Sequence, residues 1–213
     1  MKNLCALLAV VSLTVFGQTK ITLPLPSPTK IGGMPLMEAL SARHSTRKFK
    51  AEPIAEQKLG DLLWAGFGFN RAGMRTAPSA LNKQGVELYV VRPDGAWLYE
   101  PLEHALLRVS NDDLRGKTGD AKRQAFAVNA PMTIVFVFNT NVIPAIGDKR
   151  PNIMEWAKLD TGFAAQNVYL ACASMGLGAC ARGSFNNAEL VPALKLAEGK
   201  VVTLCMPVGV PED

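Results

Sequence analysis

Apolar residues recur in several parts of this chain at the three- and four-residue spacing of amphipathic helices. In one of these parts, the proline at position 53 suits a first helical turn, and Gly66 and Gly68 are expected to end the helix. A short helix is also expected directly before a basic stretch at residue 43. The spacing predicts helices in residues 35–40, 53–67, 161–175 and 187–196, with a weaker stripe in 114–128.

Other segments have the composition of β-strands. Residues 86–92 are rich in β-branched and aromatic side chains, a Pro-Asp-Gly turn signal follows, and residues 96–99 return, so a β-hairpin is predicted. Residues 132–138 form a continuous apolar run typical of a buried strand, and 201–206 form a last strand. Strands and helices do not alternate regularly. The order therefore favours an α+β fold over a doubly wound parallel sheet.

The helix predicted from residue 161 differs from the others because no charged residue occurs between positions 161 and 181. A helix that is apolar nearly all round is usually buried. Its small residues Gly162, Ala165 and Ala173 would let another backbone approach closely. A chain of this size has limited means to surround one helix, so burial against a second copy, as a homodimer, is expected.

The first residues are typical of a secretory signal. A charged start, an apolar run over residues 4–16 and a small residue at position 17 predict a signal peptide in residues 1–17. The run is too short to span a membrane, although a retained N-terminal anchor is the competing interpretation. Residues 18–33, with prolines at 24, 26 and 28, are expected to form an extended linker before a domain at 34–213. The expected location is periplasmic or secreted, with no stable membrane span after signal removal.

Composition narrows the function. The chain has 213 residues, 48% of them apolar, which suits one domain. Its formal net charge is +5, yet no stripe of basic residues interleaved with aromatic ones is present, so nucleic acid is not an expected partner. After signal removal Cys172, Cys180 and Cys205 remain without a CxxC spacing, so no metal site is expected. They are expected to be core residues, and one disulfide stays possible.

Residues 43–49, here called the basic segment, carry the side chains that a phosphate group requires. Their sequence is Arg-His-Ser-Thr-Arg-Lys-Phe. An arginine presents a planar fork of donors to phosphate oxygens, and hydroxyl groups can occupy the remaining lone pairs. A phosphorylated cofactor would explain this local excess of cations. The alternative is a solvated basic loop between two helices.

Three further features have ordinary explanations. Gly66-Phe67-Gly68 follows a helix instead of a strand, so it is interpreted as helix termination and not as a dinucleotide-binding loop. His104 falls in a segment expected to be helical, where a lone histidine is more often a surface or capping residue than a catalyst. Residues 139–153 form a long loop, which is either a mobile lid or a plain connection.

Three blocks, taken in order, resemble the nitroreductase-like family of flavin enzymes from Met34 to the C-terminus. The first is the basic segment. The second is residues 78–84, Pro-Ser-Ala-Leu-Asn-Lys-Gln, here called the edge segment. The third runs from Asp160-Thr161-Gly162 to Arg182-Gly183. The resemblance implies a central, mainly antiparallel sheet flanked by helices, and FMN held at a homodimer interface.

The resemblance also implies roles for single residues. Arg43 and Ser45, with His44 between them, would bind the phosphate, and Arg47 would face the pyrimidine oxygens. Pro78, Ser79 and Asn82 would line the ring edge. The backbone amides of Arg182 and Gly183 would reach the reactive side. No side chain is expected to be catalytic or to bind a metal, because the flavin supplies the reactive atom.

Two departures from the family pattern are visible. Many relatives have an acidic residue where this chain has Arg182, and many bind phosphate with a basic residue near a C-terminus that here reads Val210-Pro211-Glu212-Asp213. The second phosphate cation is therefore unassigned. Arg75 is a candidate, and a solvated loop residue is the other interpretation of it.

The expected activity is electron transfer from a donor such as NAD(P)H through FMN to a small nitro, quinone or enone compound. Residues 62–65 and the Arg75–Ala80 run lean towards the SagB-type branch, which implies an alternative, a dehydrogenase that oxidises a peptide or small-molecule ring. Because nicotinamide cofactors are scarce outside the cytoplasm, another reductant is the alternative to NAD(P)H as the donor. A non-catalytic flavin-binding or interaction domain is the third hypothesis.

Overall fold

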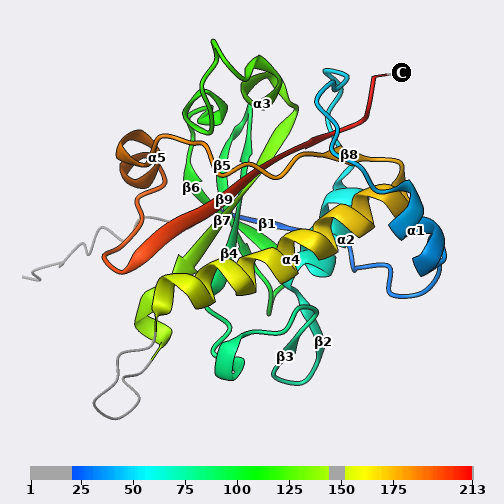
Figure 1. Ribbon diagram of the computed structural model, residues 1–213, viewed down its shortest axis with the longest axis horizontal. Coiled ribbons are helices and arrows are strands. Elements are labelled where there is room, and N and C mark those ends of the chain that lie inside the picture. The colour runs from blue at the N-terminus through cyan, green and yellow to red at the C-terminus, as the bar shows by residue number, and fades with distance from the viewer. Residues whose placement is uncertain (1–20, 144–151, 213) are drawn as a thin grey trace, which may run out of the picture.

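A seven-stranded antiparallel sheet forms the centre of the molecule, and helices cover both of its faces (Figure 1). The computed structural model describes residues 21–143 and 152–212. The strand order is β1-β6-β5-β4-β7-β9-β8, and each of these neighbouring pairs is antiparallel. The predicted α+β class, with a mainly antiparallel sheet flanked by helices, is confirmed.

The sheet consists of β1 Thr22–Pro24, β6 Ala105–Ser110, β5 Gly95–Glu100, β4 Val86–Arg92, β7 Met132–Asn139, β9 Lys200–Gly209 and β8 Gly178–Ala179. A separate two-stranded sheet is formed by β2 Phe69–Arg71 and β3 Met74–Arg75. The α-helices are α1 Leu36–Ala42, α2 Glu56–Phe67, α3 Ala125–Asn129, α4 Ile153–Met175 and α5 Asn187–Ala193. Short 3₁₀ helices occur at η1 Ala80–Asn82, η2 Arg115–Lys117 and η3 Thr140–Val142.

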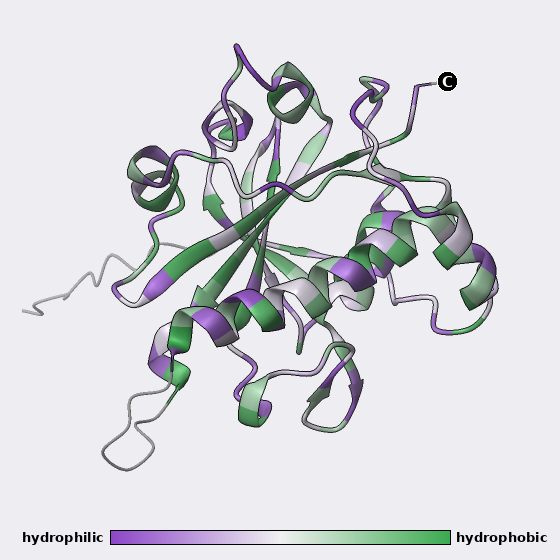
Figure 2. Ribbon diagram, viewed as in Figure 1, coloured by the Kyte–Doolittle hydropathy of each residue, from purple (hydrophilic) through white to green (hydrophobic). Residues whose placement is uncertain are grey.

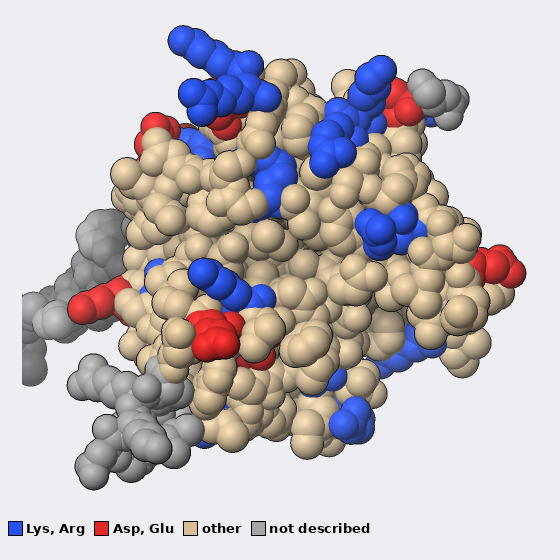
Figure 3. Space-filling view, viewed as in Figure 1, with Lys and Arg blue, Asp and Glu red and all other residues tan. Residues whose placement is uncertain are grey.

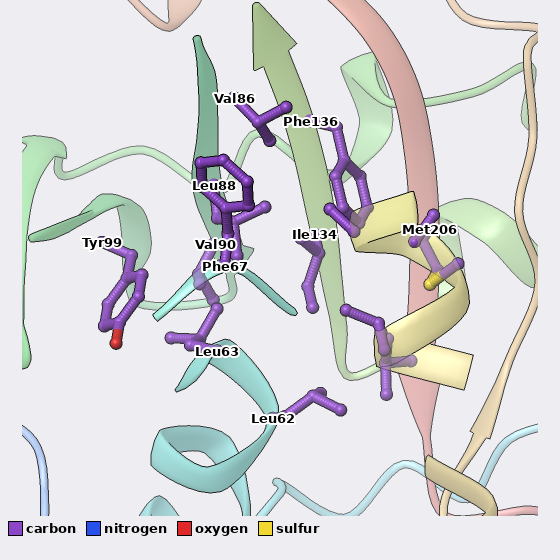
Figure 4. Packing of buried hydrophobic residues seen from close by; sticks show 14 of the residues in the cluster. Leu62, Leu63, Phe67, Val86, Leu88, Val90, Tyr99, Ile134, Phe136 and Met206 are labelled. Atoms are coloured by element: carbon purple, nitrogen blue, oxygen red, sulfur yellow. The ribbon is translucent and has the colours of Figure 1, made fainter. Parts of the chain in front are cut away.

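The main core lies between the sheet and the pair α2 and α4. On β4, Leu88 and Val90 point to this side, where they pair in register with Phe136 and Ile134 of β7. Figure 4 shows Leu62, Leu63 and Phe67 of α2 pointing towards these strands. Side chains of β4 and β7 are buried on both faces, and Figure 2 shows both strands as predominantly hydrophobic. A strand covered on both faces does not alternate between apolar and polar residues, which explains the continuous apolar run.

A second core covers the opposite face. Tyr89 and Val91 of β4 point to this side, together with Val135 of β7. Leu190 and Leu194, from α5 and the residue that follows it, are almost fully buried against them. The predicted short helix and last strand are therefore confirmed, and they close the second face of the sheet.

The helix ends follow the sequence with one difference. Gly68 caps α2, and its extended backbone prevents a further helical turn. Gly66 lies inside the helix and is buried against α4. The prediction that both glycines end α2 is therefore wrong for Gly66. The helix predicted from residue 161 begins earlier, at Ile153, and ends at Gly176, which adopts the left-handed conformation (φ 68°) that glycine favours.

His104 is not in a helix. It lies in the turn between β5 and β6 with a φ of 47°, and the residues after it form β6. The strand pairs with β5 on one side and β1 on the other, which buries Leu106 completely. These long-range partners, and not the local spacing of apolar residues, decide the conformation of this segment.

The structure also differs from the predicted linker at residues 18–33. Thr22–Pro24 form the edge strand β1, where a proline is tolerated, and Leu25 is 8% exposed with its amide donating to the His104 carbonyl. The Met34 amide donates to Ser174 Oγ at 2.8 Å. Residues 21–33 are thus extended but belong to the folded domain, because they complete the sheet edge and the core. The predicted signal peptide, residues 1–17, lies outside the described residues.

Three kinds of feature can be checked among the described residues: membrane-spanning helices, metal-binding groups and disulfides. None of the helices within 21–143 and 152–212 combines the length and apolar character that crossing a membrane requires. The same residues hold no group of three or more His, Cys, Asp or Glu side chains arranged for a metal ion. Cys172, Cys180 and Cys205 are buried free thiols, so none of them forms a disulfide in this structure.

Candidate functional site

The basic segment leaves α1 and runs beside β8 and the end of α4 (Figure 1). Ser45 and Ala179 form a parallel β-bridge, and the Thr46 amide donates to the Ala179 carbonyl at 2.8 Å. Further along, Phe49 forms a bridge with Pro211. These main-chain contacts hold the segment in place without using its charged side chains.

Tyr169 of α4 joins the basic segment to the residues after β8. Its hydroxyl accepts a hydrogen bond from the Ala181 amide at 2.7 Å and lies 3.1 Å from Ser45 Oγ. The guanidinium carbon of Arg43 lies 5.2 Å from the centre of the Tyr169 ring, within cation–π range. Sequence reasoning placed Tyr169 in the uncharged helix and missed this role. The available signal was its phenolic hydroxyl, which needs a polar partner within an otherwise apolar helix.

A cavity of about 190 Å³ lies at this junction, lined in part by Arg43, His44, Thr46 and Tyr169. The Thr46 side chain is buried, and its Oγ1 has no hydrogen-bond partner within the described part of the chain. Gly178 packs so closely on it that a Cβ at position 178 would lie 2.6 Å away. The described lining contains no Asp or Glu, so nothing in it repels an anion.

His44, Arg47 and Lys48 of the basic segment are exposed. The His44 Nδ1 lies 2.9 Å from the Ala42 carbonyl, which can only accept, so Nδ1 carries a proton, and Nε2 donates to an anion when the ring is the imidazolium. Arg47 is exposed and has no ion pair in the described part of the chain. Figure 3 shows basic side chains on the part of the surface where the segment after α1 lies in Figure 1. The guanidinium groups, imidazole and hydroxyls together fit a phosphate group such as that of FMN.

The edge segment is built differently from the basic segment. The Gln84 amide donates to Ser79 Oγ at 2.9 Å, and Gln84 Nε2 donates to Asn82 Oδ1 at 3.0 Å. Leu81, Asn82 and Gln84 have φ values of 51°, 52° and 53°, which place three residues with side chains in the left-handed region. Pro78 is exposed. The polar groups of this segment are largely bonded to one another, and its backbone is strained.

Asp160 of α4 holds the edge segment through a hydrogen bond to its backbone. The Ala80 amide donates to this carboxylate, with Oδ1 and Oδ2 at 3.0 and 3.2 Å. The side chain is 2% exposed, and burial raises the pKa of the carboxyl group against the opposing effect of the Ala80 hydrogen bond. Asp160 and Tyr169 are nine residues apart on α4, so the two segments lie about 14 Å apart along the helix.

Arg182 does not occupy the position that the resemblance implies. Its amide donates to the Cys205 carbonyl at 2.9 Å and is therefore not available to a ligand. Its guanidinium group is buried and donates to Gln124 Oε1, to the Thr118 carbonyl and to the Ser184 carbonyl. Arg182 thus ties the β9 edge to the 118–124 loop. Gly183 is exposed, with open space where a Cβ would be.

Arg75 is not a solvated loop residue, because its guanidinium group is engaged within the chain. Its guanidinium carbon lies 3.9 Å from the centre of the Phe69 ring and 5.0 Å from that of Phe67. Nε donates to Gln84 Oε1 at 2.9 Å, and another nitrogen donates to the Phe67 carbonyl. Burial lowers the pKa of this guanidinium group. Arg75 therefore supports the edge segment, and its candidacy as the second phosphate cation stays a prediction.

Comparison with known proteins gives consistent results. A profile of the nitroreductase family matches residues 40–210. A protein of Methanocaldococcus jannaschii that is named as a nitroreductase is 30% identical over 183 residues, covering 82% of this chain and 90% of that protein. A structure from Ralstonia eutropha, described as a nitroreductase, has a TM-score of 0.83 at 36% identity and covers 92% of each chain. NADPH:FMN oxidoreductase of Vibrio harveyi, complexed with NAD⁺, has a TM-score of 0.62 at 25% identity, covering 84% of this chain and 69% of that one.

These matches include the basic segment, the edge segment and α4, and they extend over most of the chain. The resemblance stated from the three blocks is therefore confirmed at the level of the family. The expected enzyme class, an FMN-dependent oxidoreductase, and the expected cofactor, FMN, are confirmed with it. The chain belongs to the nitroreductase family.

Proposed function

We propose that this protein holds FMN between two copies of the chain and passes electrons from NAD(P)H to a small nitro, quinone or enone compound. The observation that carries the proposal is the cavity beside Tyr169. It offers the guanidinium group of Arg43 and the imidazole of His44, the exposed hydroxyl of Ser45 is bonded to Tyr169 of the same lining, and the described lining contains no carboxylate. This set of donors suits a phosphate dianion.

The residues of the basic segment have separate tasks in this proposal. Arg43 and Ser45, both fixed by Tyr169, bind the phosphate and orient the cofactor. Arg47 supplies positive charge near the pyrimidine oxygens, which favours the reduced flavin over the oxidised one. When bound, FMN supplies the hydride chemistry that no side chain of this chain provides.

The outer face of α4 supports a homodimer. Leu159 is 55% exposed and Phe163 is 49% exposed, and the helix carries no charge from Thr161 to its end. Gly162 on the same face has open space where a Cβ would be. Ala165, one of the small residues expected to face a second backbone, is instead buried in the chain's own core at 5% exposure. The proposed contact therefore involves the opposite face of α4, around Gly162 and Phe163.

A twofold contact at this face would bring the two segments together. Asp160 and Tyr169 lie on either side of the middle of this exposed face, between Phe163 and Gln166, so a twofold axis passing there would place the Asp160 turn of one antiparallel α4 beside the Tyr169 turn of the other. The edge segment of one copy would then complete the basic segment of its mate. This arrangement accounts for the separation of about 14 Å between the two segments within one chain.

The acceptor, the branch and the location are finer parts of the proposal. The Arg75–Ala80 run supports a SagB-type relationship, in which the flavin would oxidise a ring in a peptide or small molecule. The apolar run over residues 4–16 supports export to the periplasm or beyond. An exported enzyme would need a reductant other than free nicotinamide, so the donor and the location have to be tested together.

The central experiment is anaerobic titration of purified protein reconstituted with FMN. We expect the flavin absorbance to bleach on addition of NADH or NADPH and to return on addition of a quinone or nitro compound. Dithionite serves as the control for a reducible flavin. Bleaching by dithionite alone would contradict the nicotinamide donor, and bleaching by a dihydro-ring compound instead would favour the SagB-type alternative. Absence of FMN binding would contradict the whole proposal.

A further inference from the structure

The edge segment has a backbone that its sequence does not favour. Leu81, Asn82 and Gln84 adopt positive φ values of 51°, 52° and 53°, and none of them is glycine. Residues with a side chain remain in this region only where the surrounding structure holds them there. The strained turn therefore needs an anchor, and the contacts of the segment identify it.

Contacts at the far end of the edge segment stay within it or reach the neighbouring hairpin. Gln84 Nε2 donates to the Gly73 carbonyl at 2.7 Å, and Gln84 Oε1 accepts from Arg75 Nε at 2.9 Å. The Asn82 amide donates to the Ser79 carbonyl. These bonds give the turn its internal shape, but they do not fix it relative to α4.

One hydrogen bond ties the edge segment to α4 among the described residues. The Ala80 amide donates to the Asp160 carboxylate, with both oxygens within 3.2 Å. Asp160 is 2% exposed and has no ion pair within the described part of the chain. A buried carboxylate without a cation costs folding free energy, so stability does not explain its presence.

The next residue on α4 makes the contrast clear. Thr161 is also buried, but its hydroxyl lies 2.8 Å from the hydroxyl of Thr203 on β9, which in turn donates to the Phe136 carbonyl. One turn of α4 thus makes a polar contact on each side. Thr161 contacts the sheet, and Asp160 contacts the strained segment.

We propose that Asp160 is a positioning residue of the flavin site, which holds the Ala80 amide so that Ser79 and Asn82 keep the conformation that binds the ring edge. The proposal rests on the FMN site described above and adds a residue to it. Asp160 acts through the backbone of the edge segment and does not contact the cofactor. An oxygen acceptor at this place is the requirement, and a negative charge is not.

Three variants test the requirement for an oxygen acceptor at position 160. Asp160→Asn retains a side-chain oxygen of the same shape for the Ala80 amide, Asp160→Ala removes it, and Thr161→Ala is the matched control on the same turn. We expect Asp160→Ala to weaken FMN binding about tenfold in a fluorescence titration, and Asp160→Asn to stay within about threefold of the parent. Thr161→Ala should lower the melting temperature and stay within about threefold of the parent in FMN affinity.

Hydrogen exchange of the FMN-free protein provides a readout that does not depend on the cofactor. The amides of residues 80–84 should exchange about tenfold faster in Asp160→Ala than in the parent, and at the parent rate in Thr161→Ala. Faster exchange with unchanged FMN affinity would overturn the positioning role while leaving the fold intact. Unchanged exchange in Asp160→Ala would overturn the anchor itself, and failure of the parent to bind FMN would instead contradict the proposed function.

A second variant removes the same hydrogen bond from its other end. Ala80→Pro eliminates the donor, and Ser79 before it has the extended backbone (φ −144°, ψ 152°) that precedes a proline without strain. If Asp160→Ala does not fold, Ala80→Pro still tests the proposal. It should show the same loss of FMN affinity, and an affinity equal to that of the parent would contradict the proposal.

Discussion

The basic segment and the edge segment, the two parts of the proposed flavin site, are built in opposite ways. In the basic segment the backbone is held by β8, and the side chains of His44 and Arg47 are left exposed without ion pairs in the described part of the chain. In the edge segment the side chains of Ser79 and Asn82 are already bonded to Gln84, and the backbone carries strain. The first segment is therefore expected to act through charge, and the second through shape.

The largest expected effect comes from keeping the two segments apart. Phe163→Glu places a charge on the outer face of α4, where two copies are proposed to meet, and an unpaired charge in such a contact is costly. We expect a monomer in light scattering, with FMN affinity reduced about a hundredfold or more, because each chain then carries only half of the site.

Leu102→Glu is the control for that change. Leu102 is 78% exposed and lies in the turn between β5 and β6, which is not part of the proposed contact, so the same charge there should leave both mass and affinity unchanged. Ala165→Glu should behave differently from both, because position 165 is in the chain's own core and the charge should prevent folding. A Phe163→Glu monomer that binds FMN like the parent would show that one chain contains the complete site.

The next effect tests the charge of the basic segment. Arg43→Ala removes a charge-assisted hydrogen bond to phosphate, worth roughly 1.5 to 3 kcal/mol, so FMN affinity should fall roughly tenfold or more. Riboflavin, which lacks the phosphate, should bind the variant and the parent with equal affinity. Arg71→Ala, which removes an exposed arginine from β2, is the control and should change neither value. Equal weakening of FMN and riboflavin would place Arg43 away from the phosphate.

The local sequence was sufficient to predict those elements whose buried faces are visible in their own pattern of apolar residues. Leu62, Leu63 and Phe67 repeat at helical intervals because α2 has one buried face, and β7 is apolar throughout because it is covered on both faces. The segments that differ depend on distant partners. β1 contains a proline and is recognisable only through its pairing with β6, and His104 lies beside a strand that two neighbours stabilise.

The same limit applies to the site. Motif resemblance selected Arg43 and Ser45 because cations and hydroxyls at short spacing are visible along the chain, and the structure places both beside Tyr169, while their role in binding phosphate stays a prediction. No contact was predicted for Tyr169, or for Asp160 at the start of the third block, because each acts on a segment about a hundred residues away, which no local pattern can indicate. Arg182 carried a misleading signal, since its charge is used to join the β9 edge to a loop.

A smaller effect separates the two arginines of the basic segment. If Arg47 lies beside the pyrimidine oxygens, it stabilises the reduced flavin more than the oxidised one, so Arg47→Ala should lower the reduction potential of bound FMN. A loss of about 1.4 kcal/mol corresponds to about 30 mV for a two-electron couple, which dye equilibration can resolve. Arg43→Ala should weaken FMN binding, but the change in reduction potential, expressed as a free energy, should be smaller than the change in binding free energy. If the reduction potential of FMN bound to Arg47→Ala equals that of the parent, Arg47 does not interact with the pyrimidine oxygens and is a solvated surface residue.

The smallest effect concerns the strain in the edge segment. Leu81 is 59% exposed with a φ of 51°, so Leu81→Gly removes about 1 kcal/mol of backbone strain and adds a similar entropy to the unfolded chain. Leu102→Gly, at an exposed position that has no positive φ, should show only the unfavourable entropy. We therefore expect Leu81→Gly to be about 1 kcal/mol less destabilising than Leu102→Gly in urea unfolding.

The same substitution should also affect binding. FMN affinity should fall a few-fold, roughly two to five, in Leu81→Gly alone, because a segment that acts through shape loses its preset turn. Equal destabilisation by the two substitutions would mean that the left-handed turn stores no strain, and unchanged FMN affinity would mean that its shape does not contribute to binding.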